Sequence, residues 1–407
     1  MSRIDELVER LCPDGVAYRP LGEVATLVRG NGMPKKMLTD SGVGAIHYGQ
    51  IYTHYGAWTD ATRSFVSPQD AMKLARVDPG NVVVTNTSEN LEDVGKAVAW
   101  MGDDQIVTGG HATVVKHSMN PKFLSYWFQT PSFAKQKRVL ATGTKVIDVS
   151  ARSLSTVVVP VPPLEVQSEV VRVLDCFTSL ETELEAELEA RKWQLEYYSE
   201  LLVSGVSIGS LVRLGEVASI ARGASPRPIR SFVTESDDGV PWIRIGDVPP
   251  DGKYISETSQ KIIRAGAEKS RVVRPGDFVL SNSMSFGRPY IVGIEGCVHD
   301  GWLVISNFEA HFIPEFLYYA LRSRSVQAQF EQRAGSGTVR NLNSEIVREV
   351  VLPCPDLGLQ RRIVDTLGKF ADLANSLSIG LPAEIAARRQ QYEYYRDRLL
   401  TFKEKAS

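Results

Sequence analysis

The sequence predicts a mixed α/β protein with an internal pseudo-two-fold repeat, in which each half is a globular domain followed by one long helix. Two observations predict this fold class. Segments of the first half recur in the second half in the same order, and an apolar seam with a spacing of three and four residues follows each globular part. We expect globular domains at 1–162 and 206–353 and helical regions at 163–205 and 354–407, with the two helices packed as an antiparallel coiled coil.

The repeat runs through the whole chain. The segment LGEVA at 21–25 returns at 214–218, and an Arg-Gly pair follows it in both copies. The segment VVVPVPPLEVQ at 157–167 aligns in the same way with EVVLPCPDLGLQ at 349–360. A unit of this length is too long for a solenoid repeat, so the pattern indicates two duplicated domains.

The globular parts contain signals for both strands and helices. Apolar runs at 82–84 and 278–280 follow Pro-Gly turns and are predicted strands. The segments 121–129 and 314–332 each begin with proline and have a helical pattern. Both domains are therefore expected to be mixed α/β.

The two helical regions carry matching seams and opposite charge. Residues 161–210 contain ten acidic and three basic residues, whereas 354–407 contain nine basic and seven acidic ones, so each helix is the expected partner of the other. Gly380 and Pro382 are positions where the second helix is expected to bend. A solvated acidic helix face is the alternative for the first helix. The seam consists of Leu174, Phe177, Leu184, Leu188, Leu195, Tyr198 and Leu202 in the first region, and Leu367, Phe370, Leu377, Tyr395 and Leu399 in the second.

Composition excludes several classes of protein. The 407 residues are 43% hydrophobic and 23% charged, which is ordinary for a folded protein and unlike a disordered or fibrous one. The four cysteines stand far apart, so neither a disulfide framework nor a cysteine-rich zinc site is expected. The charged N-terminus and the lack of a long apolar run predict a cytoplasmic protein without a membrane segment.

Signatures of catalysis are missing from the sequence. There is no phosphate-binding G-x-x-x-x-G-K-[ST] loop, no H-E-x-x-H and no G-x-S-x-G. His47, His54, His111 and His117 lack a metal-ligand pattern. We therefore expect neither a catalytic residue nor a metal site in this chain.

Glycine-punctuated loops with basic, amide and hydroxyl side chains occupy matching places in both halves. Arginine bonds guanine edges, asparagine bonds adenine edges, and lysine or hydroxyl groups hold phosphates, so the matched set favours contact with DNA. For any single residue, a solvated turn is the simpler interpretation. The candidates are Arg29, Asn31, Lys35, Lys36, Thr85, Asn86, Ser88 and Lys96 in the first half, and Arg222, Arg227, Arg230, Ser281, Asn282, Ser283 and Arg288 in the second.

The order of these motifs resembles a known family, the specificity (S) subunit of type I restriction-modification systems. LCPDGVAYRPLGEVA at 11–25 is similar to the entry of that family's first target-recognition domain. VPVPPLEVQSEVVRVLD at 159–175 and LPCPDLGLQRRIVDTLG at 352–368 are similar to the starts of its two helical regions. The second copy departs from the first with Asp356 opposite Pro163 and Gly358 opposite Glu165.

This resemblance implies a non-catalytic protein that reads double-stranded DNA. Each target-recognition domain would read one half of a split, asymmetric target, and the two helices would form the spacer between them. Two methylation subunits and additional restriction subunits would join the chain. Those partners, and not this chain, would hold S-adenosylmethionine, ATP and Mg²⁺.

Two other classes of protein remain open on sequence grounds. A stand-alone DNA-binding regulator would need the same loops without a methyltransferase partner. A coiled-coil scaffold would need the helices without DNA contact. A neighbouring gene for an adenine methyltransferase would discriminate against the regulator, and salt-sensitive binding to random duplex DNA would discriminate against the scaffold.

Overall fold

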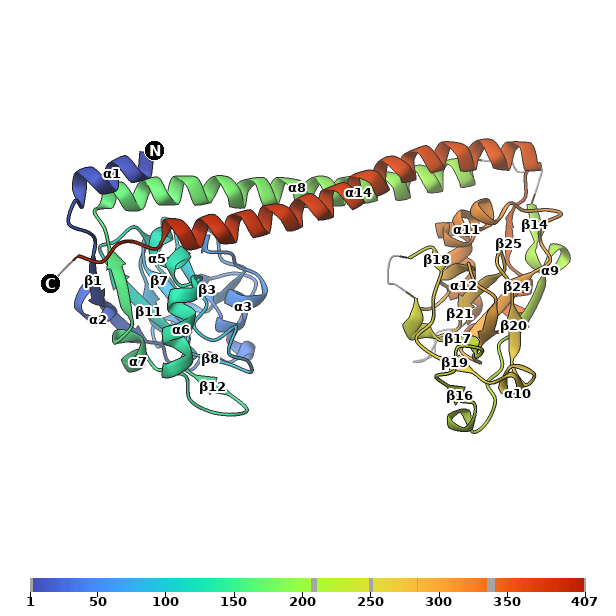
Figure 1. The fold of residues 1–407 in the computed structure, drawn as a ribbon, viewed down its shortest axis with the longest axis horizontal. Helices are drawn as coiled ribbons and strands as arrows, with labels where there is room; N and C mark the ends of the chain where they lie inside the picture. The colour runs from blue at the N-terminus through green and yellow to red at the C-terminus, as the bar shows by residue number, and fades with distance from the viewer. Residues whose placement is uncertain (1–2, 206–210, 249–251, 284, 335–340, 406–407) are drawn as a thin grey trace. The chain divides into compact units, whose positions relative to one another are not determined.

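The computed structural model describes residues 3–205, 211–248, 252–283, 285–334 and 341–405 (Figure 1). The side chains of residues 370–380 and 382 are not described either. The chain divides into two compact units, the first formed by residues 1–185 with 383–407 and the second by residues 186–382. Both long helices therefore contribute to both units.

The first unit is a mixed α/β domain with two principal sheets. Their strand orders are β2-β11-β7-β9-β4 and β5-β3-β10-β6. The strands are β1 (Ala17–Pro20), β2 (Ala25–Arg29), β3 (Val43–Ile46), β4 (Trp58–Thr59), β5 (Ser64–Val66), β6 (Ala75–Val77), β7 (Val82–Thr85), β8 (Thr87–Ser88), β9 (Ala97–Trp100), β10 (Ile106–Thr108), β11 (Ala112–His117), β12 (Ile147–Asp148) and β13 (Val158–Val161). The helices are α1 (Arg3–Leu11), α2 (Leu21–Val24), η1 (Lys35–Met37), α3 (Tyr48–Thr53), α4 (Pro68–Ala71), α5 (Pro121–Trp127), α6 (Pro131–Leu140), α7 (Ala151–Ser155) and α8 (Leu164–Ser204).

The second unit repeats this plan. Its principal sheets have the orders β15-β24-β21-β22-β18 and β16-β19-β17-β23-β20. The strands are β14 (Leu211–Arg213), β15 (Ser219–Arg222), β16 (Val233–Thr234), β17 (Val240–Ile243), β18 (Tyr254–Ile255), β19 (Lys261–Ile262), β20 (Arg271–Val273), β21 (Phe278–Ser281), β22 (Pro289–Val292), β23 (Gly296–Val298), β24 (Trp302–Ser306) and β25 (Val351–Pro353). The helices are α9 (Leu214–Val217), η3 (Ile229–Ser231), η4 (Ile245–Asp247), α10 (Arg264–Ala267), α11 (Pro314–Arg322), α12 (Arg324–Ala334), α13 (Ser344–Arg348) and α14 (Leu357–Leu399).

The duplication predicted from sequence is confirmed by strand pairing. In each unit one sheet ends in a parallel pair, β4 with β9 and β18 with β22. The other sheet contains a second parallel pair, β3 with β10 and β17 with β23. The predicted strands at 82–84 and 278–280 are the equivalent central strands β7 and β21, and the mixed α/β class is correct.

The predicted helix at 314–332 is wrong in one respect, because the structure divides it into α11 and α12. Ser323 separates the two helices. Its hydroxyl donates to the Ala320 carbonyl and accepts from the Val326 amide, which ends one helix and begins the next. The predicted helix at 121–129 is α5, where Asn120 caps the first turn ahead of Pro121.

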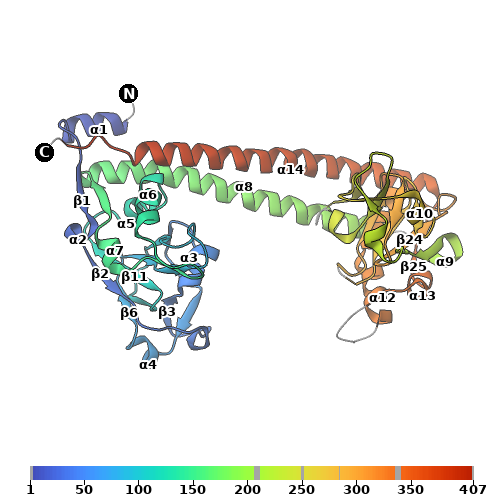
Figure 2. The same cartoon turned by 60° about the horizontal axis from the view of Figure 1, so that its bottom comes forward.

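The long helices α8 and α14 run antiparallel within each unit (Figures 1 and 2). In the first unit Phe177 stacks on Tyr395 at 5.4 Å between ring centroids, and Arg389 donates to Glu181 and, at 2.6 Å, to Glu185. The acidic helix α8 therefore does pair with a basic residue, Arg389, of the helix in the second copy. No described helix has the combination of length and apolar character that crossing a membrane requires.

The seam is buried most deeply where the helices meet the globular domains. Leu174 and Leu367 are fully buried, each in the core of one unit, and Leu202 packs against the second core. Tyr198 and Tyr395 are 37% exposed. Leu184, Leu188, Leu195 and Leu399 are partly buried, and Phe370 and Leu377 lie among the residues of α14 whose side chains are not described. Helix α14 continues through Gly380 and Pro382.

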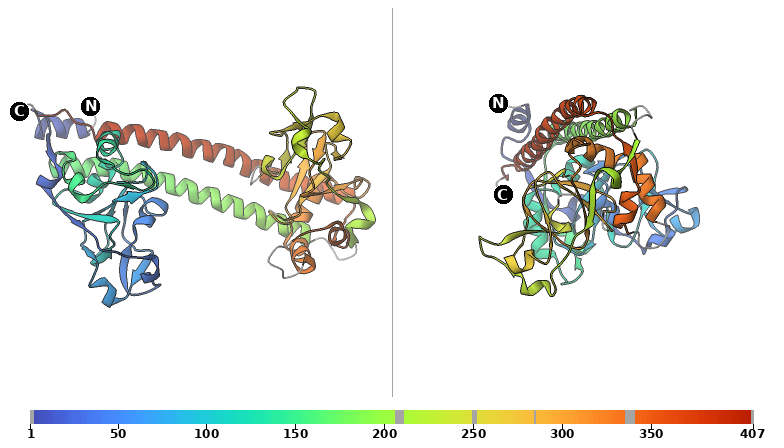
Figure 3. Two further views of the ribbon diagram at one scale, coloured as in Figure 1. Left: turned by 90° about the horizontal axis from the view of Figure 1, so that it is seen from below. Right: turned by 90° about the vertical axis from the view of Figure 1, so that its right-hand side faces the viewer.

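Figure 3 shows α8, in green, beside the first domain, and within that domain α5 packs against β7 and β9 of the first sheet. Lys122 and Tyr126 of α5 both donate to the carboxylate of Asp175 on α8, each at 2.7 Å. The ammonium group of Lys122 also lies 3.5 Å from the ring centroid of Trp58. These contacts attach the globular domain to the helix by charge-assisted hydrogen bonds.

A buried glutamine occupies the first turn of each long helix. Gln167 accepts from the Asn120 amide and donates to the Pro162 carbonyl, both at 2.7 Å. Gln360 accepts from the Ile313 amide at 2.8 Å and donates to the carbonyls of Pro355 and His311. Each side chain thus joins the helix, the preceding proline-rich strand exit and the start of α5 or α11.

We predict that Gln167→Met destabilises the first unit. The substitution keeps the length of the side chain but leaves the half-buried Asn120 amide and the buried Pro162 carbonyl without their partner, at a cost of about 1–3 kcal/mol. Urea denaturation of the full chain measures the loss. Gln194→Met, at an exposed position of the same helix, is the control and should leave stability nearly unchanged. Equal stability of the two variants would contradict the role of Gln167.

Candidate nucleic-acid interface

Both domains place an Arg-Gly pair against a tight turn. Strand β2 ends at Arg29 and β15 ends at Arg222, and a glycine follows each. A Cβ atom on Gly30 would lie 2.1 Å from the Gly109 carbonyl oxygen, and one on Gly223 would lie 2.0 Å from that of His299. Only glycine permits this approach, which explains why the Arg-Gly pair recurs in the repeat.

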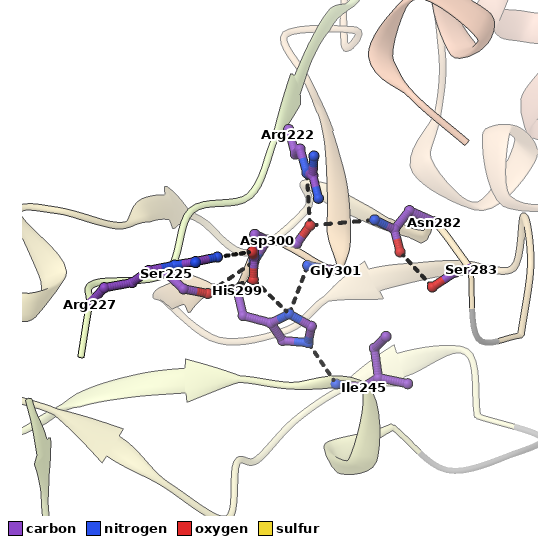
Figure 4. A network of polar contacts seen from close by, with 9 residues as sticks. All are labelled: Arg222, Ser225, Arg227, Ile245, Asn282, Ser283, His299, Asp300 and Gly301. Atoms are coloured by element: carbon purple, nitrogen blue, oxygen red, sulfur yellow. Dashed lines mark hydrogen bonds and ion pairs between the residues drawn. The ribbon is translucent and has the colours of Figure 1, made fainter. Parts of the chain in front are cut away.

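The two arginines make equivalent bonds to these turns. The Arg29 Nε donates to the Gly110 carbonyl at 3.4 Å, and the Arg222 Nε donates to the Asp300 carbonyl at 3.0 Å (Figure 4). Both side chains are exposed. The structure therefore presents one exposed guanidinium at the same place in each domain.

Two of the three candidate asparagines, Asn86 and Asn282, are buried and support the loops from inside. Asn86 is fully buried, and its amide donates to the Val149 carbonyl at 2.7 Å and accepts from Thr113 at 2.9 Å. Asn282 is 8% exposed and its amide donates to the Asp300 carbonyl at 3.4 Å. These bonds hold the turns in place. Because the side chain of Asn86 is buried and already bonded, the structure does not support its contact with a base.

The candidate hydroxyl groups are mostly buried as well. Thr85 and Ser281 are fully buried and Ser88 is 7% exposed. The Thr85 hydroxyl donates to the Asp93 carbonyl at 3.0 Å. Ser283 is exposed and donates to the Asn282 amide oxygen at 3.1 Å. Of the four, only Ser283 presents its side chain at the surface.

The remaining candidates are at the surface, and their bonds differ. Lys35 and Lys36 are exposed in η1, and Arg230 is exposed in η3. Asn31 is exposed but donates to the Lys73 carbonyl at 2.7 Å, and Lys96 forms an ion pair with Asp93 at 2.7 Å. The Arg288 guanidinium lies over the Tyr290 ring at 5.5 Å. The exposed lysines and arginines are the groups available to phosphates or bases.

Asp300 is the centre of a polar network in the second domain (Figure 4). Its carboxylate accepts from the Ser225 hydroxyl at 2.7 Å and from the Arg227 guanidinium at 3.2 Å. The bond from Ser225, followed by its own backbone amide and the charge of His299, lowers the pKa of Asp300 against the opposing effect of burial. Asp300 is therefore an ionised anchor for arginine.

His299 lies beside this anchor, and its ring is held between two backbone amides. The amides of Ile245 and Gly301 point at its two ring nitrogens, at 3.2 and 2.8 Å. A neutral imidazole has one acceptor nitrogen and a protonated one has none, so protonation would cost at least one of these contacts. Burial also lowers the pKa of His299. In the part of the chain that is described, no three His, Cys, Asp and Glu side chains gather to hold a metal ion.

Three residues near these loops were not among the sequence candidates. Arg244 and Asp300 enter because β17 and β23 pair in parallel, a contact between distant segments that a local pattern does not reveal. Lys137 is 8% exposed and donates to the carbonyls of Glu92 and Val94, so it supports the loop before Lys96. Burial lowers the pKa of Lys137. The spacing of Lys137 within an amphipathic helix gives no sign of this role.

The structure defines a protein of two duplicated α/β domains with exposed basic residues in matching loops, and comparison with known proteins identifies its family. The family model described as type I restriction modification DNA specificity domain matches residues 13–190 and again 210–387. The chain belongs to this family. It is a DNA-recognition subunit of a type I restriction-modification system, as the resemblance in the sequence indicated.

Curated relatives of the chain are specificity subunits. A putative type I restriction enzyme specificity subunit of Haemophilus influenzae is 28% identical over 95% of this chain and 96% of its own length. The EcoR124I/EcoR124II specificity subunit of Escherichia coli is 32% identical over 69% of this chain and 70% of its own length. A chain from a solved structure on assembly and conformational transition of the type I R-M system shares the fold, with a TM-score of 0.65, 19% identity and coverage of 95% and 97%.

We predict that substitutions at buried and exposed candidates separate stability from DNA binding. Asn86→Ala removes two buried hydrogen bonds and should destabilise the first unit by about 1–3 kcal/mol in urea denaturation.

Lys35→Ala combined with Lys36→Ala should leave stability unchanged. The double variant should also lower the affinity for duplex DNA and reduce the slope of its salt dependence, measured by fluorescence anisotropy. An unchanged salt slope would contradict phosphate contact at these lysines.

Proposed function

We propose that this chain reads a bipartite, asymmetric DNA target and places the other subunits of its system on that target. The first domain reads one half-site and the second domain reads the other. The long helices carry both domains and offer the surface on which methylation subunits, two in number, and restriction subunits assemble.

One observation carries this proposal: the two domains share a frame and differ in the chemistry placed on it. Arg29 and Arg222 bond to equivalent carbonyls, and Gly30 and Gly223 approach equivalent turns. The surrounding loops then diverge, with Lys35 and Lys36 in the first domain where η3 in the second contains Arg230. Two similar frames with different exposed side chains fit two different half-sites better than an inverted repeat.

We propose further that the chain is not itself an enzyme. S-adenosylmethionine, ATP and Mg²⁺ would belong to the partner subunits. The sequence motifs that bind phosphates or activate a nucleophile are missing, and the chain's family is one of specificity domains. Family membership also makes a stand-alone regulator or a pure scaffold the weaker alternatives.

An exchange of domains tests the assignment of one half-site to each domain. We predict that replacing residues 211–350 with the equivalent domain of a relative changes one half-site of the modified sequence and leaves the other intact, because each unit has its own core. Modified bases are mapped across the genome of a host that carries the complete system. The reciprocal exchange of the first domain is the matched control and should change the other half-site. A change in both half-sites after either exchange would rule out the assignment.

A transfer assay tests the non-catalytic role. We predict that the purified full chain incorporates no labelled methyl group into duplex DNA when S-adenosylmethionine is supplied. Addition of the system's methylation subunit should start incorporation in the same reaction. Incorporation by the chain alone, in a preparation free of methylation subunit by mass spectrometry, would contradict this role.

A further inference from the structure

The second domain contains an open pocket of about 870 Å³. Four segments that are distant in the sequence form it: the loop after β15, the end of β17, the residue before β19 and the turn between β23 and β24. The loop contributes Ser225 to Arg230, and the other segments contribute Trp242, Arg244, Gln260, His299 and Asp300. The pocket lies beside the network around Asp300 that Figure 4 shows.

The first domain fills the corresponding place with a side chain. Ala45 on β3 pairs with Val107 on β10, as Trp242 on β17 pairs with Cys297 on β23. Met33 is 5% exposed and packs in the same buried cluster as Ala45 and Val107. A Cβ atom on Gly109, the equivalent of His299, would lie 2.5 Å from the Met33 Cβ. Met33 therefore packs against this turn in the first domain, whereas the second domain has His299 and the lining of the pocket there.

The lining of the pocket carries positive charge. Arg227, Arg230 and Arg244 supply three guanidinium groups, and Asp300 is the carboxylate among the lining residues. Arg244 also forms an ion pair at 3.7 Å with Asp247, which lies outside the lining. Among the described residues, nothing accepts a hydrogen bond from the buried Arg244 Nε, while its Nη2 donates to Ser259 at 2.6 Å. Trp242 is 2% exposed and forms part of the wall. A polyanion fits this positively charged surface. DNA is a polyanion, and its base pairs present flat edges with polar atoms.

Arg227 is the lining residue best prepared to read a base. Its side chain is 82% exposed, and its Nη2 lies 3.2 Å from one carboxylate oxygen of Asp300. The other oxygen accepts from Ser225, whose hydroxyl in turn accepts from the Asp300 amide at 3.2 Å. One N–H of the guanidinium is thus fixed by an anchored carboxylate. Of its five N–H groups, enough remain for a bidentate bond.

We propose that Arg227, which lines this pocket and is oriented by Asp300 and Ser225, reads one guanine in the half-site of the second domain. The inference rests on the proposed function, because it assumes that this domain reads its own half-site. Arginine bonds the O6 and N7 atoms of guanine bidentately in the major groove, and a guanidinium that is already oriented loses less freedom on binding. Asp300 and Ser225 are positioning residues, and Arg227 determines specificity.

The test selects sequences from a pool of random-sequence duplex DNA, using the full chain together with its methylation subunit. The wild-type complex should enrich two half-sites, one of which contains the guanine. Arg227→Ala should abolish the preference for guanine at one position only, and it should weaken binding to the wild-type target roughly 10- to 100-fold. Arg274→Ala removes the same charge from an exposed site ahead of β21, at the end opposite Asn282, and should leave every base preference unchanged.

Asp300→Asn tests the positioning role separately. It should reduce the preference for guanine at the same position without weakening binding to random duplex, because it removes a negative charge from the surface. A loss of stability alone would lower both kinds of binding together, and that outcome would contradict a positioning role. If Asp300 had a purely structural role, Asp300→Asn would leave the preference for guanine unchanged, and this outcome would also contradict a positioning role.

The outcomes separate this inference from the proposed function. If Arg227→Ala keeps every base preference, or weakens binding to target and random duplex equally, Arg227 does not read a base and the inference is wrong. The inference would also be wrong if Arg227→Ala changed the base preference at a position where the wild-type complex does not prefer guanine. A wild-type complex that enriches no bipartite sequence would contradict the proposed function itself.

Discussion

The hydrogen bonds of one buried glutamine in each half join the recognition domains to the long helices. Gln167 is 2% exposed and Gln360 is fully buried, and both side-chain amides use their donor and acceptor on main-chain groups. An unpaired amide at such a site would cost more than the bonds contribute, so the first turn of the helix, the strand exit and the next helix must keep their arrangement. These bonds attach each domain to the first turn of its long helix, as the proposed role of placing partner subunits on DNA would require.

On this shared scaffold, the two domains differ where a ligand can reach them. The frame is conserved between the copies by a steric requirement, since only glycine fits against the turn at Gly30 and at Gly223. The space over that turn is not constrained in the same way. Met33 packs there in the first domain, and the second domain has a pocket there beside Arg227 and Asp300. Duplication followed by divergence at this point gives two domains with one fold and two surfaces.

Much of the fold was predictable because its signals are periodic or repeated. The helices α8 and α14 follow from their seams, and the duplication follows from segments such as LGEVA. The roles of individual loop residues were less predictable. Asn86 and Thr85 have the chemistry of base contacts, yet both are fully buried. Only the fold shows that Asn86 bonds to Val149 and Thr113 and that Thr85 donates to the Asp93 carbonyl. Asp300 was missed because its importance depends on the long-range approach of β23 to the loop after β15.

The central claim, that each domain contacts its own half-site, is tested most directly by site-specific cross-linking. A photo-crosslinking amino acid is placed at Lys36 in one variant and at Arg230 in another, both exposed positions. Each variant is assembled with its methylation subunits on a duplex that carries the target, and the cross-linked bases are mapped. The account predicts that the two variants label different half-sites and leave the bases between them unlabelled. Labelling of the same half-site by both variants would contradict it.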